Sequence, residues 1–385
     1  MRPVQKVGLK IILTIAVVSL ITTGLSCSKL VVKVTPEPDG SVWPMYGGDA
    51  QRTNRASNSI KPPLELTWIF KASSAVGQTL VAADGVLYFG TLDGRIRGLD
   101  VRTGKELGKI KIPDGTESTC ALDDGRLVVG QRYGEETLAV YDLHTGKRLW
   151  RRDAGDIASE ILIVEDNLCM SAIYNHVDRY DLSAGTKIWS FTTGGRLHSS
   201  PAYADGKVVV GCDDGWVYAL NWEKGTLAWK YQTHGSIFAT PTLAAGKVFI
   251  GSTDKQFYAL RLQDGTRVWT YSTDGAINQA AAVSDSVIIF GANDHRLYCL
   301  LQETGKLKWS FEASSVVSTS PLISGEVVYF GSLDHFYYAL DLTAGQLLWK
   351  YQAKGRVRTC PVVWKNFLFG ASEDNFVYAF KMVTH

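Results

Sequence analysis

The chain has 385 residues, a formal net charge of +2, and 45% hydrophobic and 20% charged residues. The near-neutral charge gives no sign of a surface for the phosphate backbone of nucleic acids, and the composition allows a large folded core. Tryptophan (11), tyrosine (17) and glycine (37) are plentiful whereas methionine is scarce (4), which favours short strands and tight turns over helices.

The N-terminus has the pattern of an export signal. Arg2, Lys6 and Lys10 form a basic segment, and residues 11–25 form an apolar run that is shorter than the ~20 residues needed to cross a bilayer. The following "TGLSC" resembles a bacterial lipobox, with Gly24 where leucine is usual. We therefore expect a signal peptide over residues 1–26, a lipidated Cys27 and a tether over 27–42; the alternative is an ordinary secreted protein cleaved near Cys27.

Removal of residues 1–26 takes away three positive charges and no acids. The remaining chain then carries a formal charge of 2 − 3 = −1. Ser28 stands where an aspartate retains many lipoproteins in the inner membrane, so we expect attachment to the outer membrane, facing the periplasm. The other cysteines are Cys120, Cys169, Cys212, Cys299 and Cys360; their spacing matches no C-x-x-C pattern, and we expect most to be buried small hydrophobes.

From residue 68 onward the chain repeats itself about every 40 residues. The repeated tryptophan stands at Trp68, Trp150, Trp189, Trp229, Trp269, Trp309 and Trp349. An eighth slot falls on Gly108, and from that slot onward a glycine stands four residues before each position. Each unit holds four short β-branched or aromatic runs separated by turn residues, as in residues 199–232. A period of 40 residues with four strands predicts a β-propeller blade.

The number of units predicts an all-β, eight-bladed propeller over residues 43–385. Three-strand sets begin near residues 77, 117, 158, 197, 237, 277, 317 and 357. The last set has no tryptophan strand after it, whereas the strand around Trp68 precedes the first set. We therefore expect the N-terminal strand to become the outer strand of the last blade and close the ring.

The repeat "ALDLTAGQLLW" (339–349) resembles the tryptophan-docking motif of the PQQ-like, or quinoprotein-like, propeller family. The resemblance covers residues 43–381, including the lead-in "WPMYGGDAQRTNR". It implies that each tryptophan stacks between an alanine of its own blade and a glycine turn of the next, so the seven tryptophans are structural. Gly98 and Gly108 depart from the motif, as do Val140 and Arg179, and the first three blades should be the least regular.

Function in a propeller often sits where the innermost strands begin. The predicted ring there consists of Gly77, Glu117, Ser159, His198, Phe238, Asn278, Ser318 and Arg358. Small residues are expected where eight strands converge. His198, Phe238 and Arg358 are bulky, and we therefore interpret them as candidate functional residues.

The first functional hypothesis is a quinoprotein dehydrogenase. The family resemblance implies that such an enzyme holds pyrroloquinoline quinone with Ca²⁺, a catalytic aspartate and a disulfide between adjacent cysteines. This sequence has no adjacent cysteines, and near the ring it offers only the carboxylates of Glu117 and Glu160, a poor set for Ca²⁺. His295 and His335 follow aspartates in equivalent turns, and we interpret them as turn residues rather than as a metal pair. We therefore expect no enzyme activity, cofactor or metal.

The second hypothesis is a protein-binding scaffold. Signal, lipid anchor, tether and propeller together resemble BamB-type lipoproteins of the outer-membrane barrel-assembly machinery. Arg196 stands where the resemblance implies a contact arginine, while Thr193 and Gly195 replace leucines, and Ser236 and Phe238 replace acids.

We predict a monomeric subunit of an envelope complex that binds its partner through Arg196, His198, Phe238 and Arg358. A propeller that senses or adheres to a peptide or sugar remains a third possibility, since fold alone does not decide function.

Overall fold

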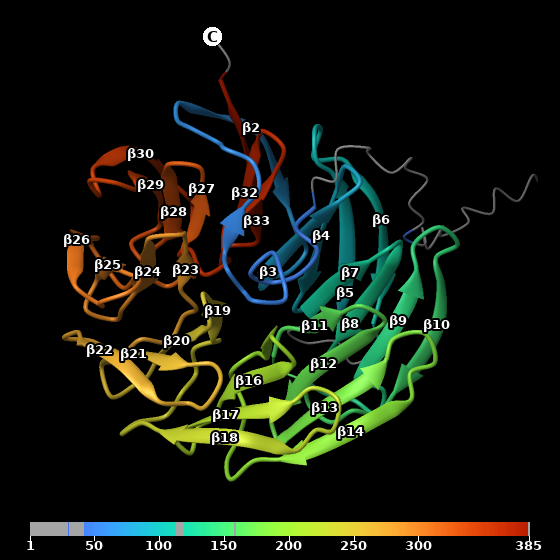
Figure 1. Cartoon of the computed structure of the whole chain (residues 1–385). Coiled ribbons are helices and arrows are strands. Elements are labelled where there is room, and N and C mark those ends of the chain that lie inside the picture. Colours follow the sequence, from blue (N-terminus) through green and yellow to red (C-terminus); the bar gives the residue numbers. More distant parts are fainter. Residues whose placement is uncertain (1–29, 31–41, 113–118, 158, 384–385) are drawn as a thin grey trace, which may run out of the picture.

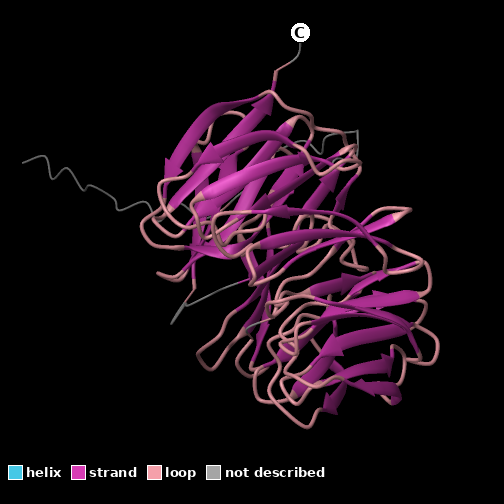
Figure 2. Ribbon diagram, turned by 90° about the vertical axis from the view of Figure 1, so that its left-hand side faces the viewer, coloured by secondary structure: helices cyan, strands magenta, loops and turns pink. Residues whose placement is uncertain are grey.

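Eight four-stranded antiparallel sheets form the blades of a closed ring, as predicted (Figure 1). The computed structural model describes residue 30 and residues 42–112, 119–157 and 159–383. Figure 2 shows that strands and their connecting loops make up the described chain. Among these residues, no helix is long and apolar enough to cross a membrane. The signal peptide, Cys27 and Glu117 lie outside the described residues.

The blades are numbered here in chain order. Blade 1 contains β3 (Val76–Ala83), β4 (Val86–Thr91), β5 (Arg95–Asp100) and β6 (Glu106–Lys111); blade 2 contains β7 (Thr119–Asp123), β8 (Arg126–Gly130), β9 (Leu138–Asp142) and β10 (Lys147–Arg152). Blade 3 contains β11 (Leu162–Val164), β12 (Asn167–Ala172), β13 (His176–Asp181) and β14 (Lys187–Thr192); blade 4 contains β15 (Ala202–Ala204), β16 (Lys207–Gly211), β17 (Trp216–Asn221) and β18 (Leu227–Gln232).

The second half of the ring repeats this order. Blade 5 contains β19 (Thr242–Ala244), β20 (Lys247–Gly251), β21 (Gln256–Arg261) and β22 (Arg267–Ser272); blade 6 contains β23 (Ala282–Val283), β24 (Val287–Gly291), β25 (Arg296–Leu301) and β26 (Leu307–Glu312). Blade 7 contains β27 (Leu322–Ser324), β28 (Val327–Gly331), β29 (Phe336–Asp341) and β30 (Leu347–Gln352), and blade 8 contains β31 (Val362–Trp364), β32 (Phe367–Ser372) and β33 (Phe376–Met382). The first strand of each blade is innermost, because these strands contact one another around the ring.

The N-terminal strand closes the ring, also as predicted. Strand β2 (Leu64–Lys71) pairs antiparallel with β33, and this pairing sets Trp68 opposite Ala379. A shorter strand, β1 (Arg55–Ala56), pairs parallel with the inner strand of blade 7. Blade 8 is therefore built from both ends of the propeller, which protects the edge that an open ring would expose.

The repeated tryptophans hold neighbouring blades together. In each of six seams, the indole Nε1–H donates to a backbone carbonyl 32 or 33 residues later, in the next blade: Trp68 to Val101, Trp150 to Leu182, Trp189 to Trp222, Trp229 to Leu262, Trp269 to Gln302 and Trp309 to Leu342. The turn glycine of that blade packs on the indole, and a Cβ added to Gly265 would lie 2.5 Å from the Trp229 ring. Glycine is required there both for this contact and for its φ of +74°.

A second aromatic layer fills five of the seams. An aromatic residue of one outer strand packs on a tyrosine of the next blade, with ring centroids 5.6–5.9 Å apart: Phe191 with Tyr218, Tyr231 with Tyr258, Tyr271 with Tyr298, Phe311 with Tyr338, and Tyr351 with Tyr378. The seam between blades 1 and 2, called here the first seam, has Ile110 and Ala139 at these positions. It also has Gly108 at the tryptophan position, so the least regular packing lies among the first three blades, where the motif departures were found.

Candidate functional site

The segment from Trp43 to Asn54 lies against one end of the inner strands and binds most of the blades. Trp43 exchanges two backbone hydrogen bonds with Ala82 of blade 1. Further carbonyls of the segment accept N–H groups spaced at the repeat period, namely Pro44 from Leu122, Ala50 from Tyr203, Gln51 from Leu243, Thr53 from Val283 and Asn54 from Ile323. This lead-in is therefore a structural clasp for the ring, a role that the repeat pattern alone did not indicate.

Arg52 contributes the buried charge of this clasp. Its side chain is fully buried, and the guanidinium donates to the backbone carbonyls of Pro201 (Nε, 3.0 Å) and Ile161 (Nη2, 3.1 Å), and through Nη1 to the carbonyl of Tyr46. Burial lowers the pKa of Arg52 to about 10. A buried cation is tolerated only when its donors are satisfied, so these bonds tie the clasp to blades 3 and 4.

Glu160 is the carboxylate whose charge acts most strongly on Arg52. It stands one residue before Ile161, at the position that Ser200, Thr240 and Ser320 take in other blades. Its Oε2 is buried and has no hydrogen-bond partner among the described residues. Burial raises the pKa of Glu160 to about 7, although the nearby Thr79 hydroxyl and the charge on Arg52 act in the opposite direction.

Among the described residues, the side chains around the axis offer few oxygen ligands for a Ca²⁺–quinone centre. In the described part of the chain, no group of three or more His, Cys, Asp or Glu side chains is placed to hold a metal ion. The charged group that acts on Glu160 is the guanidinium of Arg52, and no further carboxylate of the described chain acts on it. Ca²⁺, by contrast, takes six to eight oxygen ligands. His295 and His335 occupy turn positions with φ of 72° and 77°, consistent with their interpretation as turn residues.

The described members of the predicted ring surround the axis at the other end of the inner strands, called here the upper face. One ring member requires correction: the strand register makes Ser159 equivalent to Ser199, one position further along the inner strand than His198. Ser159 is buried and its hydroxyl donates to the Ser171 carbonyl at 2.9 Å. The slip arose because the chain between blades 2 and 3 breaks the 40-residue period.

The four predicted contact residues fall into two groups. Arg196 and His198 enter blade 4 and are exposed; His198 Nδ1 lies 2.9 Å from Asp213 Oδ2, and its ring meets the Phe238 ring edge-on at 5.6 Å. Arg358 pairs with Glu373 on blade 8. Because blades 4 and 8 are four places apart in a ring of eight, Arg358 lies across the axis from the other three.

Exposed apolar side chains extend the first group along the upper face. They follow the second strands of blades 1, 2 and 3 or precede the first strand of blade 5: Leu92 (41% exposed), Tyr133 (49%), Tyr174 (60%) and Phe238 (38%). The end of a second strand and the start of a first strand lie at the same end of a blade because the two are antiparallel. These four residues with Arg196 and His198 are called here the upper arc.

The sequence analysis did not identify Leu92, Tyr133 and Tyr174, although a signal was present for the two tyrosines. An aspartate recurs three residues after the second-strand glycine, as in Asp214 and Asp254, whose carboxylates accept the tyrosine hydroxyls of their own blades at 2.7 and 2.6 Å. Tyr133 and Tyr174 stand at that position in blades 2 and 3. The exposed tyrosines therefore stand at the positions where the recurring aspartate is missing.

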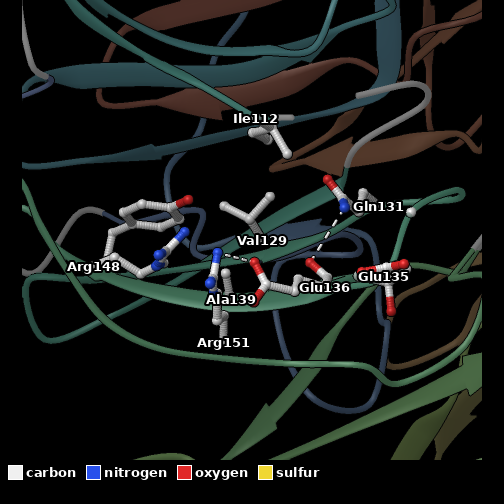
Figure 3. Close-up of a pocket in the computed structure, with 11 residues that line it drawn as sticks. Ile112, Val129, Gln131, Glu135, Glu136, Ala139, Arg148 and Arg151 are labelled. Atoms are coloured by element: carbon white, nitrogen blue, oxygen red, sulfur yellow. Dashed lines mark hydrogen bonds and ion pairs between the residues drawn. The ribbon is translucent and has the colours of Figure 1, made fainter. Parts of the chain in front are cut away.

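A cavity of about 460 Å³ opens in the first seam (Figure 3). It occupies the seam that has Gly108 at the tryptophan position, between Ile112 of blade 1 and Val129, Ala139 and Tyr141 of blade 2. Figure 3 shows its polar side chains gathered along one wall. There Arg151 pairs with Glu136, and the Gln131 amide donates to the Glu136 carbonyl at 3.2 Å.

The described cysteines give no redox site. Cys120, Cys169, Cys212, Cys299 and Cys360 are all buried and form no disulfide with one another. Burial raises the pKa of the Cys360 thiol to about 11, and a protonated buried thiol is a poor nucleophile. Cys299 replaces the alanine beside Trp309 in strand register, so it serves as a packing residue.

Comparison with known proteins gives one family and two functional classes within it. The family model PQQ_2, outer membrane protein assembly factor BamB, matches residues 92–195, 174–290 and 273–380. A 1-butanol dehydrogenase (cytochrome c) of Thauera butanivorans is 31% identical over 148 residues, which cover 34% of this chain and 21% of that protein. Outer membrane protein assembly factor BamB of Burkholderia pseudomallei is 24% identical over 184 residues, covering 45% of this chain and 48% of the relative.

Structural similarity extends over most of the chain. The crystal structure of BamB from Moraxella catarrhalis superposes with a TM-score of 0.71 at 19% identity, covering 83% of this chain and 99% of the other. At 19% identity this similarity shows that the two chains share a fold. The chain spans less than half the length of the curated relatives it matches.

Proposed function

The chain belongs to the PQQ_2 family of outer membrane protein assembly factor BamB, and from this membership we propose that it is a non-catalytic, lipid-anchored scaffold of the cell envelope. In this proposal it binds a protein partner during the assembly of outer-membrane β-barrel proteins. The mature chain acts as a monomeric subunit of a larger complex. The lipid on Cys27 holds it at the outer membrane, facing the periplasm, although Cys27 lies outside the described residues.

The observation that carries this proposal is the upper arc. Monomeric proteins seldom expose several large aromatic and aliphatic side chains together on one face, and such groupings favour protein contact. Tyrosine, phenylalanine and arginine are also the residue types enriched at interfaces. The arc offers Tyr133, Tyr174 and Phe238 beside the basic Arg196, a combination suited to a partner surface with apolar side chains and an acidic residue.

A quinoprotein dehydrogenase is the alternative that the 1-butanol dehydrogenase relative favours. The residues around the axis argue against it, because Glu160 faces Arg52 and no cluster of oxygen ligands gathers near it within the described chain. We therefore derive no reaction through a quinone. A sensor or adhesive propeller would share the upper arc, and the identity of the bound molecule separates it from the scaffold.

The test is a binding experiment in intact cells with matched variants. Tyr174→Ala and Phe238→Ala remove exposed side chains from the upper arc, whereas Val268→Ala removes an exposed side chain from an outer strand of blade 5. After cross-linking, purification of the wild type is expected to recover a barrel-assembly protein, and the double arc variant to lose at least about tenfold of it. Equal recovery from all variants would contradict the role of the arc. A quinone that copurifies with the chain would favour the dehydrogenase.

The anchor is tested separately. Cys27→Ala is expected to remain unprocessed or to enter the soluble periplasmic fraction, because a single-residue change removes the acylated side chain. A processed Cys27→Ala chain that still sediments with the outer membrane would contradict the lipid anchor.

A further inference from the structure

The first seam lacks the tryptophan that locks six other seams. Gly108 occupies the tryptophan position of blade 1, and Gly98 lies opposite it in strand register. Other blades have Ala219 or Ala259 at the position of Gly98, beside Trp229 or Trp269. The seam has therefore lost an indole ring on one strand and a methyl group on the strand beside it.

Leu30 of the N-terminal region fills part of this space. It is fully buried and belongs to the cluster that joins the two blades, with Val86 and Tyr88 of blade 1 and Tyr141 and Leu143 of blade 2. A Cβ added at position 98 would lie 2.7 Å from Leu30 Cδ1 and 3.2 Å from Val86 Cγ1. An alanine at position 98 would therefore displace the Cδ1 methyl group of Leu30 from its place in the seam.

The glycine is not there for its backbone freedom. Gly98 is absent from the glycines with positive φ in the described chain, and it pairs regularly with Tyr88 and Gly108 in the sheet. An extended strand accepts alanine without strain, as Ala219 and Ala259 illustrate. The backbone therefore does not require glycine here, and the side chain that an alanine would displace is Leu30.

We propose that Leu30 is a docking residue that fastens the N-terminal tether into the first seam. Two residues separate it from Cys27, so the attachment point of the proposed lipid lies within about 11 Å of Leu30. Without docking, the 16 residues from 27 to 42 would reach up to about 55 Å. Docking therefore shortens the chain between the lipid and the propeller, and it places blades 1 and 2 next to the membrane. The orientation rests on the proposed lipid anchor, whereas the docking does not.

Docking is tested by trypsin cleavage between Lys29 and Leu30 in the full mature chain in detergent. A protease needs an extended stretch around the cleaved bond, so burial of Leu30 protects it, and cleavage follows the population of the undocked form. Leu30→Ala is expected to speed cleavage at least about tenfold. Gly98→Ala leaves the cleaved sequence unchanged and is also expected to speed cleavage, because the added methyl group must displace Leu30 Cδ1. Leu227→Ala, at an exposed leucine of blade 4, is the control and should cleave at the wild-type rate.

The double variant makes the test specific. Once Leu30→Ala has removed the clashing methyl groups, Gly98→Ala should add little further acceleration, because the two changes act on one contact. Circular dichroism checks that each variant keeps its β-structure. Equal cleavage rates in the wild type, Leu30→Ala and Gly98→Ala would overturn the docking.

The orientation is tested in phosphatidylethanolamine–phosphatidylglycerol vesicles that contain spin-labelled lipid. A fluorophore is attached through Leu149→Cys in blade 2 or Leu307→Cys in blade 6, two exposed positions on opposite sides of the ring. We expect stronger quenching at 149 than at 307, and loss of this difference in Gly98→Ala. Equal quenching in the wild type would overturn the orientation. A chain that does not bind the vesicles would refute the anchor and leave the trypsin result to judge the docking.

Discussion

Replacement of Glu160 by glutamine should change how the stability of the propeller depends on pH. The folded chain raises the pKa of this carboxyl from 4.5 to about 7, chiefly by burial. A group with a raised folded pKa favours the protonated form in the folded state, so its contribution is complete below pH 4.5 and is lost as pH rises through 7. The difference between 4.5 and about 7 corresponds to a loss of about 3 kcal/mol.

Glu160→Gln keeps the shape and removes the titration. At pH 4 the variant and the wild type should have nearly the same free energy of unfolding, because the wild-type carboxyl is largely protonated in both the folded and the unfolded chain. At pH 8.5 the variant should be the more stable by up to about 3 kcal/mol. The groups that interact with Glu160 are Arg52, the Tyr46 and Thr79 hydroxyls, and the thiols of Cys120 and Cys360.

The assay is urea denaturation followed by tryptophan fluorescence at a series of pH values. Glu65→Gln, at an exposed residue of β2, is the control for loss of one negative charge. The wild type should lose stability between about pH 5 and pH 8 relative to Glu160→Gln, and Glu65→Gln should follow the wild type. Parallel curves for the wild type and Glu160→Gln would refute a buried, neutral Glu160.

Three further changes test the packing. Arg52→Met should cost about 3 kcal/mol or more, because it leaves the carbonyls of Pro201 and Ile161 without their buried donor; an unchanged urea midpoint would contradict the clasp. Trp229→Ala should cost about 3–5 kcal/mol through lost burial and the lost bond to Leu262, measured against Trp216→Ala at a partly exposed site. Ala139→Tyr should fill the first-seam cavity and raise the melting temperature, with a gain of about 1 kcal/mol; a lower melting temperature would show that the cavity cannot accept the ring.

The repeat made the fold predictable because one local pattern recurs together with the turn residues that end its strands. Ala219, Gly225 and Trp229 are an example. The glycine marks the turn that contacts an indole, and the alanine beside the indole marks the register of the two outer strands. The spare strand around Trp68 likewise required a partner at the C-terminus, and β33 provides it. These features depend on residues close in sequence, which is why sequence reasoning reached them.

The arrangement around the axis depends on contacts between distant residues. The clasp from Trp43 to Asn54 bonds to carbonyls and amides up to about 270 residues away, through backbone atoms that leave no side-chain signature. Leu30 in the first seam was equally invisible, since a single leucine in a tether is unremarkable until Gly98 and Gly108 are seen to leave a space. The sequence analysis assigned the four contact residues to one face. Their division between two sides of the axis became visible only from the positions of blades 4, 5 and 8 in the closed ring.

The most direct test of the scaffold is site-specific photocross-linking in living cells from position 174 on the upper arc and position 268 on an outer strand. The account predicts that a photoreactive residue in place of Tyr174 cross-links to one barrel-assembly protein, and that the same residue in place of Val268 does not. Cross-linking of that protein from position 268 and not from 174, or from neither position in cells where the chain is membrane-held, would contradict it.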